Sequence, residues 1–524
     1  MSIKIKKIIL FFFLTSFGLQ AQIQKISDLS NNQFLDSKII YDNNGEDVWG
    51  YFLLYKGDKK SKSIQEYQFV ILDKNLNKVG SNKFQQEFSN HWFTEAFPNI
   101  DYLNKNENEL IFGIDFDNRY DFGSFLFRKI DLKTFEISSA YFSRNEQLIQ
   151  DNGLIQNFDE KKLLPDFFVP VANKGFIKYE REYKGKNEFS SLSEFRKADF
   201  KGYSFYDLNL KKKWEVKYKL TEDSGENCYS EFANDKYFVV RKNFYGKVYK
   251  GKNKYFYEVK DISTGQDIIS IPIEDFKYTY VNNKVFIQDN KIYIFDRIYE
   301  FDKKNEIYQK KCLGISKRVY DIDKKTFLEQ KFMFWTDLAK FHKISKYGEI
   351  KGIFIHLLDF KITSEGKTMI VGEGYFTGQQ STIIKNLYTF GLDSEFKVES
   401  FGEIETQKTT YSDYVAYGDK LEANNLFDFM YSQKIRSDEF VYFYSDNEVK
   451  RGFLDSVLPE LSELLPDNWV LGIVVYSDGE FKHQKIKLKT NKGKIYPLKA
   501  KKGFIILQEV SKTDNEIRLE KIDY

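Results

Sequence analysis

The sequence predicts an all-β fold: a β-propeller-like radial array of seven or eight four-stranded blades with short helical insertions. Three observations support this prediction. A strand-turn-strand unit recurs about every 55 to 85 residues, a second set of strands shows period-two patterning, and the composition is rich in aromatic residues. One four-stranded sheet cannot bury both of its own faces, so similar sheets that recur along a chain pack side by side around a ring.

The recurring unit consists of an apolar-aromatic strand, a turn that contains aspartate, and the start of a second strand. Its clearest copies are Tyr67–Leu76, Phe125–Thr134 and Tyr203–Leu210. Aspartate favours such turns because its side chain hydrogen-bonds to backbone N–H groups that follow it. The unit returns at Tyr255–Gly265, Val319–Thr326, Leu387–Glu395 and Val470–Gly479, which makes seven copies.

A second set of strands precedes or accompanies these hairpins. Its members alternate apolar and polar residues or run apolar, which is typical of half-buried and buried strands. The set contains eight segments, so the blade number stays between seven and eight. The segments are Val48–Tyr55, Glu109–Phe116, Gly175–Tyr179, Tyr237–Val240, Lys291–Phe295, Thr368–Tyr375, Glu439–Tyr444 and Gly503–Gln508.

The composition fits this architecture. The chain holds 51 Phe and 36 Tyr but only 7 Pro, and aromatic residues favour pleated, half-buried sheets. No Gly/Ser-rich or Pro-rich linker interrupts the strands, so we expect residues 22–524 to form one domain. Cys228 and Cys312 are the only cysteines. Two thiols make no disulfide framework, and their pairing stays open.

Three segments complete the expected architecture. Asp455–Pro466 is predicted to form a short amphipathic helix, because proline stands near its start and again at its end. Asn145–Lys162 is predicted to hold a turn or two of helix. The C-terminal segment Ile517–Tyr524 is predicted to be a closing strand that completes the sheet of the first blade and locks the ring.

The N-terminus predicts a secretory signal peptide over residues 1–21. Lys4, Lys6 and Lys7 precede an uncharged run from Ile8 to Leu19. A basic segment, a short apolar segment and a small residue at the cut describe such a signal, so we expect cleavage after Ala21. No later apolar stretch approaches the length of a membrane span. We therefore expect an exported protein, periplasmic rather than extracellular or surface-attached.

The charge balance limits the classes of partner. Removal of residues 1–21 leaves 77 basic and 77 acidic side chains. A balanced surface lacks the electrostatic attraction toward phosphate backbones or anionic lipids, which argues against nucleic-acid and membrane binding. We expect a monomer that binds a protein or glycan ligand at a propeller face.

Two stretches resemble a known group of proteins. They are Gly50–Lys60 together with Ile71–Asn77, and later Ser364–Tyr375. Here the chain resembles secreted Bacteroidetes proteins of unknown function, and the strand rhythm extends the resemblance over most of residues 22–524. The resemblance implies an exported, propeller-like protein. It implies no activity, cofactor or catalytic residue.

The candidate binding residues are Glu373, His356 and Tyr375. Glu373 lies between glycines in an apolar strand, and a charge in such a strand must be paired or face a polar channel. His356 lies in the preceding apolar strand, so it is expected to be a cross-strand neighbour of Glu373. A Glu–His contact suits proton transfer or ligand orientation. The alternative is a structural hydrogen bond within the sheet.

Other motifs lack a feature that their chemistry needs. Gly372–Gly378 has the wrong spacing for a phosphate-binding loop. Asp115–Asp121 lacks the glycine of a calcium loop and is read as a polar hairpin turn. Thr221–Gly225 resembles a single Asp-box turn of sialidase-type propellers. The four histidines are not closely spaced, and no Gly-x-Ser-x-Gly elbow occurs. We therefore expect no metal, cofactor or assigned catalytic residue.

Three functional hypotheses follow. The first is an exported, non-catalytic propeller-like binding or scaffold protein. The second is a carbohydrate-active hydrolase that uses carboxylates on a propeller face. The third is a component of a cell-envelope assembly that recognises its partner through its insertions, among them residues 455–466.

Overall fold

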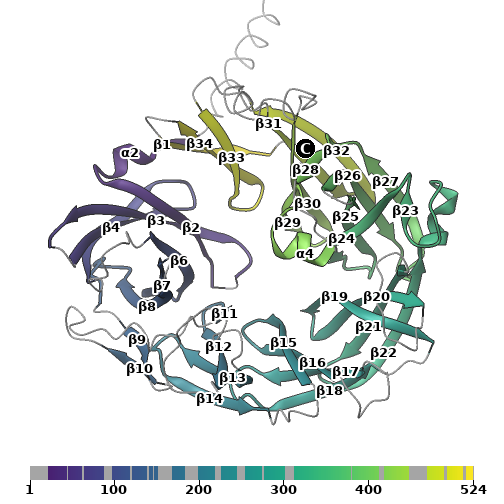
Figure 1. The fold of residues 1–524 in the computed structure, drawn as a ribbon, viewed down its shortest axis with the longest axis horizontal. Helices are drawn as coiled ribbons and strands as arrows, with labels where there is room; N and C mark the ends of the chain where they lie inside the picture. The colour runs from purple at the N-terminus through teal and green to yellow at the C-terminus, as the bar shows by residue number, and fades with distance from the viewer. Residues whose placement is uncertain are drawn as a thin grey trace, which may run out of the picture.

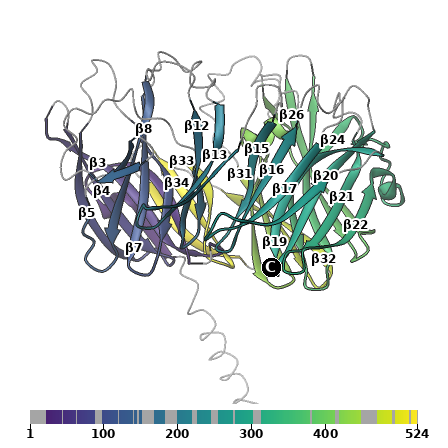
Figure 2. The ribbon, with the colours of Figure 1, turned by 90° about the horizontal axis from the view of Figure 1, so that it is seen from below.

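Eight β-sheets form a closed ring in the computed structural model of the chain (Figure 1). The strands run between the two faces of the ring, which Figure 2 shows from the side. The eightfold propeller decides between the two predicted blade numbers. The structure describes residues 22–43, 45–61, 64–87, 97–118, 121–138, 141–144, 147–150, 168–182, 199–218, 226–244, 254–273, 277–300, 312–378, 381–411, 418–447, 469–488, 493–511 and 515–522.

The first four blades follow one another along the chain, each an antiparallel sheet in sequence order. Blade 1 contains β2 (Gln33–Tyr41), β3 (Val48–Lys59), β4 (Ile64–Asp73) and β5 (Lys78–Glu87). Blade 2 contains β6 (Phe97–Lys105), β7 (Glu109–Asn118), β8 (Asp121–Asp131), β9 (Tyr141–Arg144) and β10 (Gln147–Gln150). Blade 3 contains β11 (Phe168–Val171), β12 (Gly175–Glu182), β13 (Asp199–Asp207) and β14 (Lys212–Lys217). Blade 4 contains β15 (Glu226–Ala233), β16 (Tyr237–Phe244), β17 (Lys254–Asp261) and β18 (Asp267–Ile273).

The last four blades complete the ring. Blade 5 contains β19 (Tyr278–Gln288), β20 (Lys291–Glu300), β21 (Cys312–Asp321) and β22 (Thr326–Phe334). Blade 6 contains β23 (Glu349–Ile350), β24 (Ile353–Ile362), β25 (Thr368–Thr377), β26 (Thr382–Leu392), β27 (Val398–Ile404) and β28 (Thr409–Tyr411). Blade 7 contains β29 (Phe429–Arg436), β30 (Glu439–Asn447), β31 (Trp469–Ser477) and β32 (Glu480–Leu488). Blade 8 contains β33 (Gly493–Lys499), β34 (Phe504–Ser511), β35 (Asn515–Lys521) and β1 (Gln22–Lys25).

The ring closes through strands from the two ends of the chain. Gln22 in β1 pairs with Leu519 in β35, and Lys25 pairs with Glu516. The predicted closing role of the C-terminal strand is therefore confirmed, but the expected sheet was wrong. The N-terminal strand completes the last blade, because β35 already occupies the third position of that sheet and leaves the fourth position to β1.

The hydrophobic core is divided among the contacts between neighbouring blades. Each of the eight contacts has its own cluster of buried residues. Between blades 1 and 2, for example, Phe52 stacks on Phe69 and its ring centroid lies 5.0 Å from that of Phe112. Many of the aromatic residues in the described part of the chain therefore serve blade packing.

The aspartate of the recurring unit organises the turn between the third and fourth strands. In blade 1, Asp73 Oδ1 accepts hydrogen bonds from the backbone N–H groups of Asn75 and Asn77 at 2.8 and 2.9 Å. Leu76 has a φ of 68°, a conformation that favours glycine, yet its side chain is fully buried against blade 8. Leu210 and Phe396 have similar φ values and also pack against the preceding blade. The turn thus fixes both the hairpin and the neighbouring blade.

Short helices lie outside the sheets: α2 (Ile26–Leu29), a 3₁₀ helix over Trp335–Lys340, and α4 (Gly418–Ala423). The predicted helix over residues 455–466 falls outside the described residues, as does Thr221–Gly225. Within Asn145–Lys162, which was predicted to hold a turn or two of helix, Gln147–Gln150 forms β10 and pairs with β9. The rest of that segment falls outside the described residues.

The two cysteines form no disulfide with one another: both are buried, in different inter-blade clusters. Cys228 lies between blades 3 and 4, whereas Cys312 lies between blades 5 and 6. Among the described residues, no helix is long and apolar enough to cross a membrane.

The two faces of the ring carry different connections. We call one the hairpin face, because it carries the turns that join the first to the second strand and the third to the fourth strand of each blade. We call the other the connection face, because it carries the segments that join the second to the third strand and each blade to the next. In blade 6, α4 belongs to the connection between blades 6 and 7, and Figure 1 shows it beside β24 and β29 at the inner edge of the ring.

Candidate functional site at the inner edge of blade 6

The candidate site is built on the hairpin of β24 and β25. His356 in β24 pairs directly with Glu373 in β25, which confirms the predicted cross-strand neighbourhood. Residues directly opposite each other in an antiparallel pair place their side chains on the same face of the sheet. All of Thr368–Tyr375 is buried, so this hairpin is a rigid base.

The sequence suggested a contact between His356 and Glu373. In the structure, His356 instead hydrogen-bonds to a residue of α4. Its Nε2 lies 2.7 Å from Oε2 of Glu422. The ring stacks on Phe427 at 5.2 Å and meets Tyr375 edge-on at 6.4 Å. Only 3 % of His356 is exposed, whereas 46 % of the Glu422 side chain is exposed. A buried imidazole thus holds an accessible carboxylate in place.

The start of α4 packs tightly on the same imidazole. A Cβ at Gly418 would lie 2.4 Å from His356 Nδ1, so a side chain at this position is incompatible with the contact. Leu421 is fully buried in a small cluster with Tyr375 and Ile384. This ninth cluster attaches α4 to blade 6 and is separate from the eight clusters between blades.

Blade 5 supplies a second anchor for α4. Nη2 of Arg297 lies 2.7 and 2.8 Å from the two carboxylate oxygens of Asp419. The Arg297 side chain is 8 % exposed and that of Asp419 is 57 % exposed. Asp419 and Glu422 stand three residues apart on α4, so both carboxylates lie on one side of the helix. Each exposed acid is therefore fixed by a buried partner from a different blade.

Glu373 faces a different neighbour, at the contact between blades 6 and 7. Its Oε2 accepts a hydrogen bond of 2.9 Å from the backbone N–H of Asp428. Its Oε1 has no hydrogen-bond partner among the described residues, and the residue is fully buried. Burial raises the pKa of Glu373 well above its usual value, and the charge of Asp428 raises it further.

Asp428 is the second member of this carboxyl pair. Burial raises the pKa of Asp428 to about 7, although a hydrogen bond from Thr409 acts in the opposite direction. Thr409 Oγ1 lies 3.2 and 3.3 Å from the two carboxylate oxygens. The charge of Asp446 also raises the pKa of Asp428, even though Lys485 lies 2.7 Å from Asp446. The pair therefore retains a proton near neutral pH.

The structure thus brings two of the three predicted residues into contact and adds four residues that sequence reasoning missed. His356 and Tyr375 contact one another, whereas Glu373 points to the neighbouring blade contact. The added residues are Asp419, Glu422, Arg297 and Asp428. Only the pattern Asp-x-x-Glu after Gly418 offered a sequence signal, because it places two carboxylates on one helix side.

One group of side chains has the composition of a metal site. His356, Asp419 and Glu422 each offer one ligand atom, and these atoms all lie within 4.8 Å of one another. Nitrogen and carboxylate oxygen are suitable ligands for divalent transition metals. Histidine spacing along the chain gave no sign of this group, because the other two ligands come from α4, more than sixty residues away.

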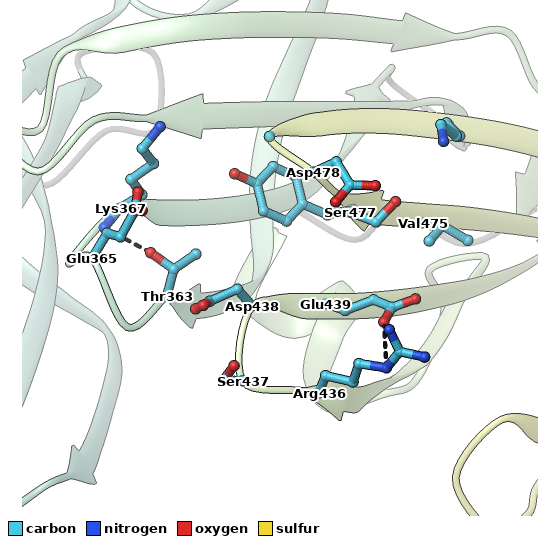
Figure 3. Close-up of a pocket in the computed structure, with 13 residues that line it drawn as sticks. Thr363, Glu365, Lys367, Arg436, Ser437, Asp438, Glu439, Val475, Ser477 and Asp478 are labelled. Atoms are coloured by element: carbon cyan, nitrogen blue, oxygen red, sulfur yellow. Dashed lines mark hydrogen bonds and ion pairs between the residues drawn. The ribbon is translucent and has the colours of Figure 1, made fainter.

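A hollow lies on the hairpin face, between blades 6 and 7 (Figure 3). It has a volume of 700 Å3. Its polar groups largely bind one another: Ser364 donates to Asp438, and Arg436 lies 3.4 Å from Glu439. The site at α4 differs because its exposed carboxylates are held from below by buried partners. The hollow is lined by Thr363, Glu365, Lys367, Arg436, Ser437, Asp438, Glu439, Val475, Tyr476, Ser477, Asp478, Gly479 and Lys482.

Comparison with known proteins gives a family but no activity. A model described as a family of unknown function (DUF6770) matches residues 3–389. No curated protein sequence matches the chain. Among solved structures, the WD40 domain of SCAP from fission yeast has 8 % identity and a TM-score of 0.34, with 96 % of this chain and 98 % of that one covered.

A second solved structure is the polysaccharide lyase Uly1. It shares 9 % identity at a TM-score of 0.37, and the match covers 96 % of this chain and 99 % of the lyase. These values are too low to support an argument about ligand or reaction.

Proposed function

Because the chain belongs to the family of unknown function DUF6770, its function has to be inferred from its own residues. We propose that it is an exported, non-catalytic binding protein whose ligand, a protein or a glycan, docks at the inner edge of blade 6. His356, Tyr375 and Glu373 form the base of this site, and α4 carries its accessible groups.

The division between buried and exposed groups supports binding over catalysis. Glu373, the carboxylate best suited by sequence to proton transfer, is fully buried and already bonded to the backbone of Asp428. The accessible acids are Asp419 and Glu422, each fixed by a buried cation or imidazole. Such fixed acceptors bind hydroxyl, amide or ammonium donors without losing side-chain freedom.

The binding site is tested with variants on opposite faces of the ring. Glu422→Gln removes the charge from an exposed acceptor and is expected to weaken the binding of a ligand found in a glycan and envelope-protein screen at least about tenfold, the value of a charge-assisted hydrogen bond. Glu365→Gln, in the hollow on the hairpin face, is the matched control and should leave affinity unchanged. Equal affinities of the two variants would place the ligand elsewhere.

The proposed export is compatible with closure of the ring. Cleavage after Ala21 leaves Gln22 as the first residue, and Gln22–Lys25 forms β1. The cut therefore removes the signal and spares the strand that closes the ring. We expect mass spectrometry of the protein from the periplasmic fraction to find Gln22 at the N-terminus. An uncleaved chain, or a cut within Gln22–Lys25, would contradict this expectation.

One observation favours the hydrolase as a second candidate function. Asp428 is partly exposed, and its pKa of about 7 suits a general acid or base near neutral pH. This function predicts the release of reducing ends from a glycan substrate and the loss of that release in Asp428→Asn. The envelope-assembly hypothesis depends on residues 455–466, which fall outside the described residues, and deletion of these residues is its test.

A further inference from the structure

We propose that His356, Asp419 and Glu422 bind one divalent metal ion, with Zn²⁺ as the best match. The inference names a component of the binding site proposed above and rests on that function for its biological use. No metal was expected from the sequence, because the four histidines are dispersed.

The three ligand atoms are close enough to share an ion. One imidazole nitrogen and two carboxylate oxygens lie within 4.8 Å of one another. Zinc binds such atoms at about 2.0–2.2 Å, which places neighbouring ligand atoms about 3.3 Å apart around a tetrahedral ion. His356 Nε2 and Glu422 Oε2 are now 2.7 Å apart in a hydrogen bond. A small rotation of the exposed Glu422 side chain would replace that bond with two metal bonds.

Neighbouring residues fix the orientation of two of the three ligand side chains, as they do in most metal sites. The His356 ring is fixed by stacking on Phe427, by the edge of Tyr375 and by the close approach of Gly418. Asp419 is oriented by the buried guanidinium of Arg297. Contacts of this kind set ligand orientation and contribute to metal affinity.

The charges favour a divalent ion with an open coordination position. Two carboxylates and one guanidinium carry a net charge of −1, so a divalent cation compensates the exposed acids. An imidazole with carboxylates selects a transition metal over Ca²⁺ or Mg²⁺, which prefer oxygen ligands alone. Three protein ligands leave a fourth position for water or for an oxygen of the docked ligand.

Calorimetric titration of the mature chain, Gln22–Tyr524, with ZnCl₂ after treatment with EDTA tests the site. We expect one Zn²⁺ per chain, a much weaker response to CaCl₂, and a visible absorption spectrum when Co²⁺ replaces Zn²⁺. Glu422→Gln should weaken Zn²⁺ binding at least tenfold, and Glu365→Gln should not change it. Because the Glu422 side chain is 46 % exposed, its variant is expected to fold, which circular dichroism checks.

Two outcomes overturn the metal site: absence of Zn²⁺ binding in the wild type, or equal binding by the wild type and Glu422→Gln. Ligand binding with and without EDTA separates this result from the proposed function. Ligand binding that persists in EDTA with no Zn²⁺ uptake rejects the metal and keeps the binding function. Zn²⁺ uptake without any ligand sensitive to Glu422→Gln supports the metal site and rejects the proposed docking site.

Discussion

Truncation after Asn515 is expected to abolish the cooperative folding of the ring. The deletion removes β35 from Glu516 onward together with the residues after it, and with them Ile517, Leu519 and Ile522, which are 5, 5 and 6 % exposed. Burial of each such side chain contributes about 1.5–3 kcal/mol, so their combined loss is comparable to the whole stability of a typical domain. The deletion also takes away the hydrogen-bonding partner of β1. Circular dichroism and urea titration of residues 22–515 measure the effect.

A shorter truncation serves as the matched control. Removal of Asp523 and Tyr524 alone leaves β35 intact and should preserve the cooperative transition. A smaller deletion at the other end, of Gln22–Lys25, should lower stability without removing the buried side chains of β35. A cooperative transition of wild-type midpoint in the 22–515 chain would show that the ring does not depend on this closure.

Lowering the pH from 8 to 5 is expected to stabilise the contact between blades 6 and 7. The folded-state pKa of Asp428 is raised to about 7 from 3.8, so folding is penalised wherever the unfolded carboxyl is ionised. The penalty is absent below pH 3.8, the pKa of the carboxyl in the unfolded chain, and it grows as the pH rises toward 7. The free energy of unfolding therefore falls between pH 3.8 and about pH 7. Glu373, whose pKa is also raised, acts in the same direction.

The size of the pH effect on the free energy of unfolding follows from the shift in the pKa of Asp428. The full shift of about three pKa units corresponds to about 4 kcal/mol, and about two of these units fall between pH 5 and pH 8. The partial exposure of Asp428 reduces the expected effect further, to about 1–2 kcal/mol. Urea titrations at pH 5 and pH 8 measure it. Other carboxyl groups also titrate, so the informative quantity is the difference from Asp428→Asn and Glu373→Gln. Both variants should be more stable than the wild type at pH 8, and their advantage should shrink at pH 5. An advantage independent of pH would reject the raised pKa values.

The sequence predicted the blades well because each repeat carries its own signal. The eight predicted segments with period-two patterning are the second strands of the eight blades, from β3 to β34, when the two-residue strand β23 of blade 6 is not counted. The strand-turn-strand unit, by contrast, marks the third and fourth strands and occurs only seven times. Blade 8 lacks the unit because its fourth strand is β1, which comes from the opposite end of the chain. The two counts disagreed for a structural reason.

The candidate site could be predicted only where it lies within one hairpin. His356 and Glu373 are joined by a short turn, so their register follows from the strand pattern. The actual partner of His356, Glu422, lies on a six-residue helix too short to give a clear periodic signal. Arg297 comes from another blade. Contacts between blades depend on how the sheets pack around the ring, which no local pattern encodes.

The composite eighth blade determines when the protein can finish folding. Strand β1 is synthesised before every other strand of the ring, and its partner β35 after all of them. Contacts so distant in sequence form slowly, because nearly the whole chain must be ordered before they are gained. In an exported chain, the last β-ladder would therefore form only after translocation is complete. Ring closure would thus be the last step of folding. A chain that lacks β35 would keep an unpaired strand edge, which promotes aggregation.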